Sequence, residues 1–210
     1  MSINLDMLFE PFPKEAIHWR VGSTNKAYAK SDDELKGIAL AYIDARDVMN
    51  RLDGVCGAAN WQCRYPFEGC CELGILIDGE WIWKANGAGR TDVEGEKGQY
   101  SDSFKRAAVM WGVGQYLYSL PNEWVKIKRS GKSFKLAATP TLPNWAQAGA
   151  KGRMNKKDTD EYVAQMTECL VNADEEGVKQ LADELDNDQK LYIWRFFNSA
   201  QRGTIKNFIG

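Results

Sequence analysis

The sequence is poor in the residues that carry most metal and nucleophilic chemistry. It has one histidine, His18, and five cysteines with no C-x-x-C spacing. A zinc site built from Cys and His takes about four such ligands, and the adjacent Cys70 and Cys71 would point to opposite faces of a strand. These features argue against a zinc quartet and against Ser-His or Cys-His catalysis. They favour free thiols in a reducing compartment.

Long apolar runs are also missing. No stretch reaches the length of about 20 residues that crosses a bilayer, and the opening segment, MSINLDMLFEPFPKEA, carries acids where a secretory signal carries cations. We therefore expect a cytoplasmic protein with no membrane partner. At 210 residues, with 44% hydrophobic and 27% charged residues, the chain can bury one main core and a smaller second unit.

Nucleotide-binding motifs are incomplete. The tripeptide GKS at 131–133 would need a glycine at position 126 to form a phosphate loop, and that residue is Lys126. The GAG at 87–89 and the GVG at 112–114 do not continue to the third glycine of a dinucleotide site. We therefore expect no cofactor.

The basic excess that many nucleic-acid binders have is absent, since 27 Lys and Arg residues stand against 29 Asp and Glu residues. Residues 1–138 are balanced, with 18 of each sign, whereas residues 158–188 hold eleven acids and one cation. Within the front part, VKIKRSGKSFKL (125–136) carries five cations and no acid. The net acidity therefore belongs to the tail, and the front part keeps a local basic surface.

Among the features that are present, three strand-like runs follow one another: NWQCRYPFE, CCELGILI and EWIWKA. Asp78-Gly79 between the last two predicts a tight hairpin, because such a turn needs positive φ. The runs predict a three-stranded antiparallel meander. A second hairpin is predicted in VKIKRSGKSFKL, turning at Ser130-Gly131, with Lys126 and Lys128 on one face.

Helical spacing is found on both sides of the meander. A helix is predicted within residues 33–52, ending near Gly54. Its apolar positions are Tyr42, Val48, Met49 and Leu52. These elements predict a three-stranded antiparallel meander flanked by helices, followed by a small C-terminal helical region.

The segment SDSFKRAAVMWGVGQYLY (101–118) combines a helical apolar face with two adjacent cations. The predicted packing face consists of Tyr100, Phe104, Ala107, Ala108 and Trp111. Lys105 and Arg106 then point away from it, and Gly112 and Gly114 are natural ends for the helix. A pair of adjacent cations is often only a solvated flank, so its meaning depends on the rest of the chain.

Composition divides the chain into three parts. Residues 1–138 form the main predicted domain, and residues 139–157 have the Pro, Ala and Gly content of a linker. Residues 158–210 predict a helical region that docks a partner or regulates the main domain. The alternative for that region is a helical cap packed on its own domain.

Three alternate acids, Asp92, Glu94 and Glu96, leave a second function open. Such carboxylates can hold divalent ions for phosphodiester hydrolysis, as in a metal-dependent nuclease. Acids in this spacing also mark helix starts, where the helix dipole favours them.

Trp81 and Trp83 share one strand face, and we interpret them as core or subunit packing rather than as base-stacking platforms.

Arg20, the Lys105-Arg106 pair and the hairpin cations Lys126 and Lys128 are candidates for a phosphate-tracking surface. Contacts of this kind give affinity without sequence information. No base-reading motif accompanies them in the sequence.

Four ordered stretches carry a family resemblance: PFPKEAIHWRVG (11–22), AYIDARDVMNRLDGVCGAANWQ (41–62), DGEWIWKANGAGRTDVEGEKGQYSDSFKRAAVMWGVGQYLY (78–118) and LPNEWV (120–125). They resemble the Rad-fifty-two superfamily and, more narrowly, its bacteriophage single-strand annealing proteins. The resemblance extends over residues 1–138 and covers the tail only loosely.

The resemblance implies an α+β fold in which an antiparallel three- to four-stranded sheet packs on a helix. A further implication is that subunits lie side by side in a ring, with single-stranded DNA in a basic groove around it. It also implies that Lys105 and Arg106 are the groove's cation pair and that Arg20 is a further backbone contact, and Lys97 completes the predicted DNA-binding set. The sequence departs from the family where some members have another arginine, because that residue is Val109 here. The segment STNKAYAKSDDELKG is also built differently.

We therefore predict a protein that is not an enzyme and that anneals complementary DNA strands without ATP, in phage homologous recombination or double-strand-break repair. The predicted partners are single-stranded DNA, further copies of the chain in a ring, and a host single-strand-binding protein or a phage exonuclease. The predicted location is the cytoplasm of a bacterial host. The alternatives are the metal-dependent nuclease and a binder that coats the strand without annealing.

Overall fold

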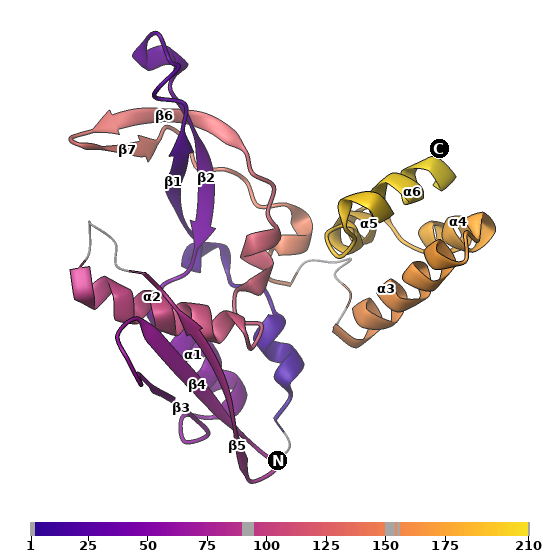
Figure 1. Cartoon of the computed structure of the whole chain (residues 1–210), viewed down its shortest axis with the longest axis horizontal. Helices are drawn as coiled ribbons and strands as arrows, with labels where there is room; N and C mark the ends of the chain where they lie inside the picture. Colours follow the sequence, from indigo (N-terminus) through magenta and orange to yellow (C-terminus); the bar gives the residue numbers. More distant parts are fainter. Residues whose placement is uncertain (1–2, 90–94, 150–153, 155, 210) are drawn as a thin grey trace. The chain divides into compact units, whose positions relative to one another are not determined.

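The computed structural model describes residues 3–89, 95–149, 154 and 156–209. The chain forms two compact units, Met1–Leu142 and Pro143–Gly210 (Figure 1). The first contains two antiparallel sheets and two α-helices, and the second is helical. The predicted α+β class is confirmed.

One sheet is the predicted meander, formed by β3 (Trp61–Arg64), β4 (Cys70–Ile77) and β5 (Glu80–Gly87) in that order. All of its pairings are antiparallel, and the β4–β5 turn falls at Asp78 and Gly79 with φ of 51° and 87°. Two consecutive positive φ angles define the type I′ turn, whose twist matches that of the flanking strands. The prediction of this hairpin is confirmed.

Two helices cover one face of the three-stranded sheet. They are α1 (Ala45–Cys56) and α2 (Gly95–Val109), and Figure 1 shows α2 running between the two sheets. The core between helices and sheet is closed by the side chains Val48, Leu52, Leu73, Ile75, Phe104, Ala107 and Ala108. Trp111 seals one end, since its indole N–H donates to the Leu73 carbonyl at 3.1 Å. Burial of this apolar surface is the main stabilising contribution to the unit.

The predicted packing face of α2 is correct at four of its five positions. Phe104, Ala107, Ala108 and Trp111 are buried, but Tyr100 is exposed by 37%. Its ring lies edge-on against Tyr65, which follows the edge strand β3, so it lies at the margin of the core. Local periodicity cannot show where the sheet ends under a helix.

The second sheet has four strands in the order β1-β2-β6-β7. They are β1 (His18–Thr24), β2 (Lys36–Tyr42), β6 (Trp124–Ser130) and β7 (Ser133–Leu136), all paired antiparallel (Figure 1). One face is packed, with Ala39 and Ile127 buried. The fold therefore has two sheets where the sequence predicted one of three to four strands.

The helix predicted within residues 33–52 is wrong in its first half. Lys36–Tyr42 is strand β2, and α1 begins only at Ala45, after the N-cap Asp44. Gly37 and Ala39 are buried at alternate positions, which is the period of a strand. The helix also continues past Gly54 to Cys56, and Gly57 with φ of 82° follows it.

The second predicted hairpin forms, but its turn lies one residue later than predicted. Ser130 pairs with Ser133, so the turn residues are Gly131 and Lys132. Gly131 has φ of 59°, which suits glycine at the first turn position of a type II′ turn. Because Lys126 and Lys128 precede the turn, their shared face is as predicted.

The C-terminal end of α2 is a Schellman motif built on Gly112. The Val113 N–H donates to Ala108 at 3.2 Å and the Gly112 N–H donates to Val109 at 2.9 Å, and Gly112 has φ of 97°. This pair of bonds satisfies carbonyls that the helix leaves open. A Cβ at Gly112 would lie 2.6 Å from the Phe9 ring.

We expect Gly112→Ala to lower the free energy of unfolding by about 1–3 kcal/mol, because it adds both a strained backbone angle and an overlap. Urea unfolding followed by tryptophan fluorescence measures this change. The matched control is Gly54→Ala on α1, whose new methyl meets nothing within 4 Å and should stabilise the helix by about 0.5–1 kcal/mol. Equal midpoints for the two variants would contradict the role assigned to Gly112.

The second unit contains four α-helices. They are α3 (Lys156–Val171), α4 (Glu175–Asp183), α5 (Asn187–Trp194) and α6 (Ser199–Ile209). Val178 is fully buried, and the Tyr162 hydroxyl donates to the Leu181 carbonyl at 2.7 Å. Trp145, from within the segment predicted as a linker, is buried and lies 6.3 Å from the Tyr192 ring. Part of that segment thus packs with the helices.

Short 3-10 helices connect the larger elements. They are η1 (Leu5–Phe9), η2 (Lys14–Ala16), η3 (Asp32–Glu34), η4 (Gln115–Ser119) and η5 (Asn144–Ala146). Across the described residues, every helix is too short or too polar to span a membrane.

Candidate nucleic-acid interface

The register of the four-stranded sheet gathers cations on its exposed face. Residues opposite one another in an antiparallel pair share a face, and so do residues two apart along a strand. Lys36 on β2 pairs with Lys126 on β6, and Lys128 on β6 pairs with Lys135 on β7. Arg20 on β1 pairs with Leu40, which lies on the same face of β2 as Lys36. We call these five exposed cations the basic face: Arg20, Lys36, Lys126, Lys128 and Lys135.

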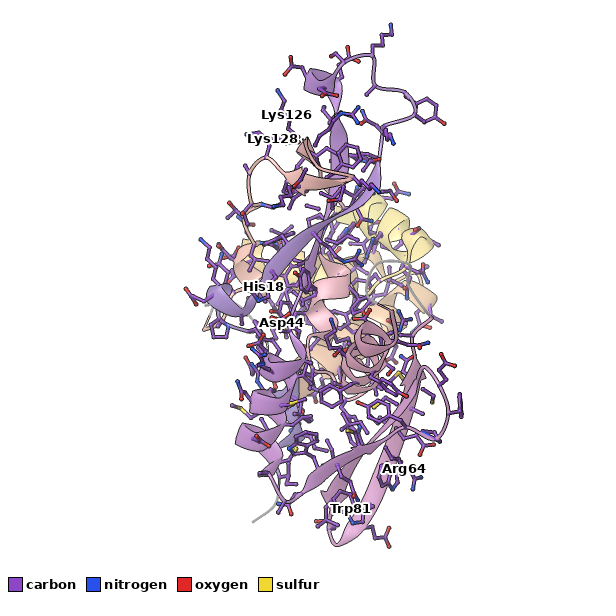
Figure 2. The ribbon with its side chains drawn as sticks, turned by 90° about the vertical axis from the view of Figure 1, so that its left-hand side faces the viewer. His18, Asp44, Arg64, Trp81, Lys126 and Lys128 are labelled. Atoms are coloured by element: carbon purple, nitrogen blue, oxygen red, sulfur yellow. The ribbon has the colours of Figure 1, made fainter. Side chains whose placement is uncertain are left out.

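The opposite face of the same sheet fixes this orientation. Ile127 lies between Lys126 and Lys128 and is 1% exposed, and Ala39 on β2 is 5% exposed. A slip of one residue would expose these apolar side chains and bury the lysines. Among the described positions of the cationic side of β1, β2, β6 and β7, none holds an acid. Figure 2 shows Lys126 and Lys128 toward one end of this sheet and His18 toward the other.

An acidic turn competes for part of this surface. Asp33 forms an ion pair with Lys126 of the basic face at 3.2 Å, and Asp32 forms one at 2.9 Å with Arg129, which lies on the face of Ile127. Both acids belong to η3, between β1 and β2. The Asp33 side chain is 93% exposed, and an exposed pair of this kind contributes only about 0–1 kcal/mol. A phosphate can therefore displace the acids.

We expect Asp32→Asn with Asp33→Asn to raise the affinity for single-stranded DNA about three- to tenfold, because Asp33 no longer competes with phosphates for Lys126 and the turn beside the basic face loses two negative charges. Fluorescence anisotropy with a labelled oligonucleotide at fixed salt measures the change. The control is Glu168→Gln with Glu176→Gln, two exposed helical acids of the second unit that give the same change in net charge. An equal gain in both variants would show a general charge effect.

Lys105 extends the cationic surface beyond the sheet. Its ammonium lies 3.0 Å from Asp102, one helical turn earlier, and 5.7 Å from the centre of the Tyr42 ring. Tyr42 is the last residue of β2, and its ring centre lies 5.5 Å from that of His18. Arg20 follows two residues after His18 on the same face of β1. The structure thus brings Lys105 to the Tyr42 ring, on the sheet face that also carries Arg20, 85 residues away in the sequence.

Two predicted DNA-binding residues remain, Arg106 and Lys97, and the structure describes the side chain of Arg106 only. Arg106 is exposed on α2, and its backbone carbonyl accepts a hydrogen bond from Asn86 at 3.2 Å. Lys97 lies in the first turn of α2, and its side chain falls outside the described part of the chain.

The alternative metal site cannot be placed. Asp92 and Glu94 lie outside the described residues, and only the backbone of Glu96, in the first turn of α2, is described. The nuclease alternative therefore has no described geometry.

Comparison with known proteins gives the family. The profile of the Rad52/22 family of double-strand break repair proteins matches residues 4–67 and 75–135, more than half of the sequence. The chain belongs to the Rad52/22 family. Every candidate DNA-binding residue named above lies within the matched ranges, and α3 to α6 lie outside them. The narrower bacteriophage type stays a prediction.

Two curated relatives carry the name single-stranded DNA-binding protein DdrA. The protein from Deinococcus deserti is 34% identical over 145 residues, and that from Deinococcus radiodurans is 30% identical over 145 residues. Each match covers 65% of this chain, and the chain covers 66% and 64% of the two relatives, just under two thirds of their length. No solved structure matches the chain.

Three residues of the candidate nucleic-acid interface were not predicted from the sequence. Lys36 and Tyr42 were hidden because their segment was predicted as helix, and Lys135 was counted among the hairpin cations without being assigned a face. Alternation of exposed and buried positions over KGIALAY was the available signal. It is weak, because glycine and alanine occur in helices and strands alike.

The outer face of the three-stranded sheet carries aromatic rather than cationic character. Trp81 and Trp83 lie on it with ring centres 6.1 Å apart, and the Arg64 guanidinium stacks over Trp83 at 4.1 Å while it pairs with Glu72. Gly74 faces Trp83 and leaves room for its ring. Figure 2 places Arg64 and Trp81 away from Lys126 and Lys128. The predicted sharing of one face by the tryptophans is confirmed.

The inner face of that sheet carries the most acidic thiol of the described residues. A hydrogen bond from Cys71 is the main cause that lowers the pKa of Cys63 to about 6, against the opposing effect of burial. The same contact raises the pKa of Cys71. The thiols lie apart from the basic face, and we assign them no part in DNA binding.

Proposed function

We propose that this protein binds single-stranded DNA along the basic face and through Lys105 and Arg106, and that it anneals complementary strands during double-strand-break repair. The observation that carries the proposal is the alignment of five exposed cations on one face of the four-stranded sheet, with Lys105 at its end. Membership of a double-strand break repair family and the names of the two relatives support it.

The basic face suits a phosphate backbone better than a base sequence. Lysine and arginine side chains that stand on a sheet contact phosphates as cations, and such contacts carry no sequence information. Seven contacts, one from each member of the basic face and one each from Lys105 and Arg106, give an expected slope of log K against log salt of about −5 for single strands. Binding should be almost equal for mixed sequences of one length.

Annealing follows from the same arrangement. Two strands repel each other through their phosphates, and self-structure hides their bases. Cations along an exposed sheet neutralise the phosphates and hold the strand extended, which leaves the bases free to pair. Base pairing and stacking then supply the free energy, so the step uses no ATP and no bond chemistry.

The finer proposals concern context and assembly. We propose that subunits associate side by side into a ring, so that the short basic surface of one subunit continues in the next. The protein would act in the cytoplasm of a bacterial host on phage DNA, with residues 158–210 docking a host single-strand-binding protein or a phage exonuclease. Native mass spectrometry with and without an oligonucleotide tests the assembly.

The deciding experiment follows two complementary labelled oligonucleotides by energy transfer, without nucleotide and in EDTA. Acceleration of annealing over the protein-free rate supports the proposal. Binding that slows renaturation would identify a coating protein instead. Loss of full-length oligonucleotide on addition of magnesium, measured on denaturing gels, would favour the nuclease alternative.

A further inference from the structure

The single histidine of the chain meets two carboxylates at the start of α1. His18 Nε2 lies 3.5 Å from Asp44 Oδ2, and the ligand atoms of His18, Asp44 and Asp47 all lie within 4.8 Å of one another. Atoms bound to one metal at about 2.0–2.2 Å lie about 3–4.4 Å apart. Small side-chain rotations would therefore bring these ligand atoms within coordination distance of one ion. Figure 2 shows His18 and Asp44 together at this place.

Two independent elements create the cluster. His18 begins β1, whereas Asp44 is the N-cap of α1 and Asp47 stands three residues later. Pairing of His18 with Tyr42 brings β1 to the strand end that leads into the helix. The histidine is thus positioned by the sheet, and the carboxylates are positioned by the helix start.

Helix capping uses only some of the lone-pair sites of the two carboxylates. Asp44 and Asp47 form a capping box, in which Asp47 Oδ2 accepts the Asp44 N–H at 3.1 Å. A carboxylate has about four lone-pair sites, so each one can cap the helix and still bind an ion. The positive end of the helix dipole disfavours a cation here, and the two carboxylate charges oppose that effect.

We propose that His18, Asp44 and Asp47 bind one divalent transition-metal ion. One imidazole nitrogen and two carboxylates form a mixed donor set that favours ions such as Mn²⁺ or Zn²⁺ over Ca²⁺, which takes oxygen ligands. Three protein ligands leave further positions open to water or to a phosphate oxygen. The side chains of His18 and Asp44 are 43% and 60% exposed, so an ion can enter from solvent.

The position gives the bound ion a clear electrostatic consequence. The centre of the Tyr42 ring lies 5.5 Å from that of His18 and 5.7 Å from the Lys105 ammonium, and Arg20 follows His18 on the same strand face. Without an ion, the two carboxylates place negative charge at this corner of the candidate interface, where it opposes phosphate binding. A divalent ion cancels their charge next to two cations that are proposed to bind phosphate.

The test uses the full-length protein without a histidine tag, in a nitrogen-free buffer, with Mn²⁺ alone as the probe. Mn²⁺ avoids the exposed thiol Cys63, which would compete for Zn²⁺. Loss of the free-ion electron paramagnetic resonance signal gives affinity and stoichiometry, and electron spin echo envelope modulation detects a nitrogen bound directly to the ion. Since the chain has one histidine, an imidazole signal identifies His18.

We expect one Mn²⁺ per chain with imidazole modulation, loss of that modulation in His18→Ala, and affinity weakened at least about tenfold in His18→Ala and in Asp44→Asn. Asn caps a helix as well as Asp does, so Asp44→Asn removes a ligand charge and keeps the fold. The control is Asp174→Asn, at the N-cap of α4. Absence of imidazole modulation at saturating Mn²⁺, or equal affinity in wild type and Asp44→Asn, would overturn the proposal.

Discussion

Replacing both Lys105 and Arg106 by alanine should weaken binding of single-stranded DNA about 100-fold at moderate salt. A charge-assisted contact contributes about 1.5 kcal/mol or more, and two such losses give that factor. Lys105 is positioned by the Tyr42 ring and by Asp102, and Arg106 is exposed one residue later on α2. The Lys105 side chain is 25% exposed and Arg106 lies on the exposed side, so circular dichroism of the variant is compared with that of the wild type before binding is measured.

The salt dependence separates loss of phosphate contacts from a folding defect. Titrations by fluorescence anisotropy at several salt concentrations should show a slope of log K against log salt that is smaller in magnitude by about 1.4, which is two single-strand contacts. All sequences of one length should be affected alike. The matched control is Lys157→Ala with Lys190→Ala, two exposed cations of the second unit. A changed sequence preference, or an equal loss in the control, would refute the assignment.

Reversal of two charges on the basic face, Lys126→Glu with Lys128→Glu, should weaken binding about 100-fold or more. The change removes two phosphate contacts and places two acids on a surface that has none at its described positions. Ile127 between them keeps its buried place, so the melting temperature should stay nearly constant. Anisotropy and circular dichroism on the same preparation measure both quantities.

This variant also decides whether the sheet and α2 form one DNA path. If they do, a short oligonucleotide that occupies only part of the path should lose less affinity than a long one. A variant with the same change in charge elsewhere, Lys157→Glu with Lys190→Glu, controls for net charge. Normal binding and normal annealing by Lys126→Glu with Lys128→Glu would confine DNA to the neighbourhood of Lys105 and Arg106.

Several features were predictable because they depend on neighbours in the sequence. Asp78-Gly79 specifies its hairpin through the φ angles of two residues, and both are positive in the structure. The buried face of α2 follows from helical periodicity, as Phe104 and Ala107 show. The same periodicity places Lys105 and Arg106 away from the core. Such features use short-range geometry, which the residues themselves carry.

The segment before α1 shows where local information fails. KGIALAY contains small and apolar residues that suit either a helix or a strand, and only pairing with β1 and β6 decides that it is a strand. The partner β6 lies far along the chain, since Lys36 pairs with Lys126, 90 positions later. The choice between helix and strand depends on the burial of Ala39 and Ile127 together on the inner face of the sheet. No short stretch of sequence contains both residues.

The sequence by itself determined an α+β protein with a central meander, a basic hairpin and a cation pair on the outside of a helix. Only the tertiary structure decided that Arg20, Lys36 and Lys126 share one face, that Lys105 meets the same surface through Tyr42, and that His18 reaches Asp44. The physical reason is that strand register is set by burial of apolar side chains from distant segments, and the exposed cations take whatever positions that register leaves them.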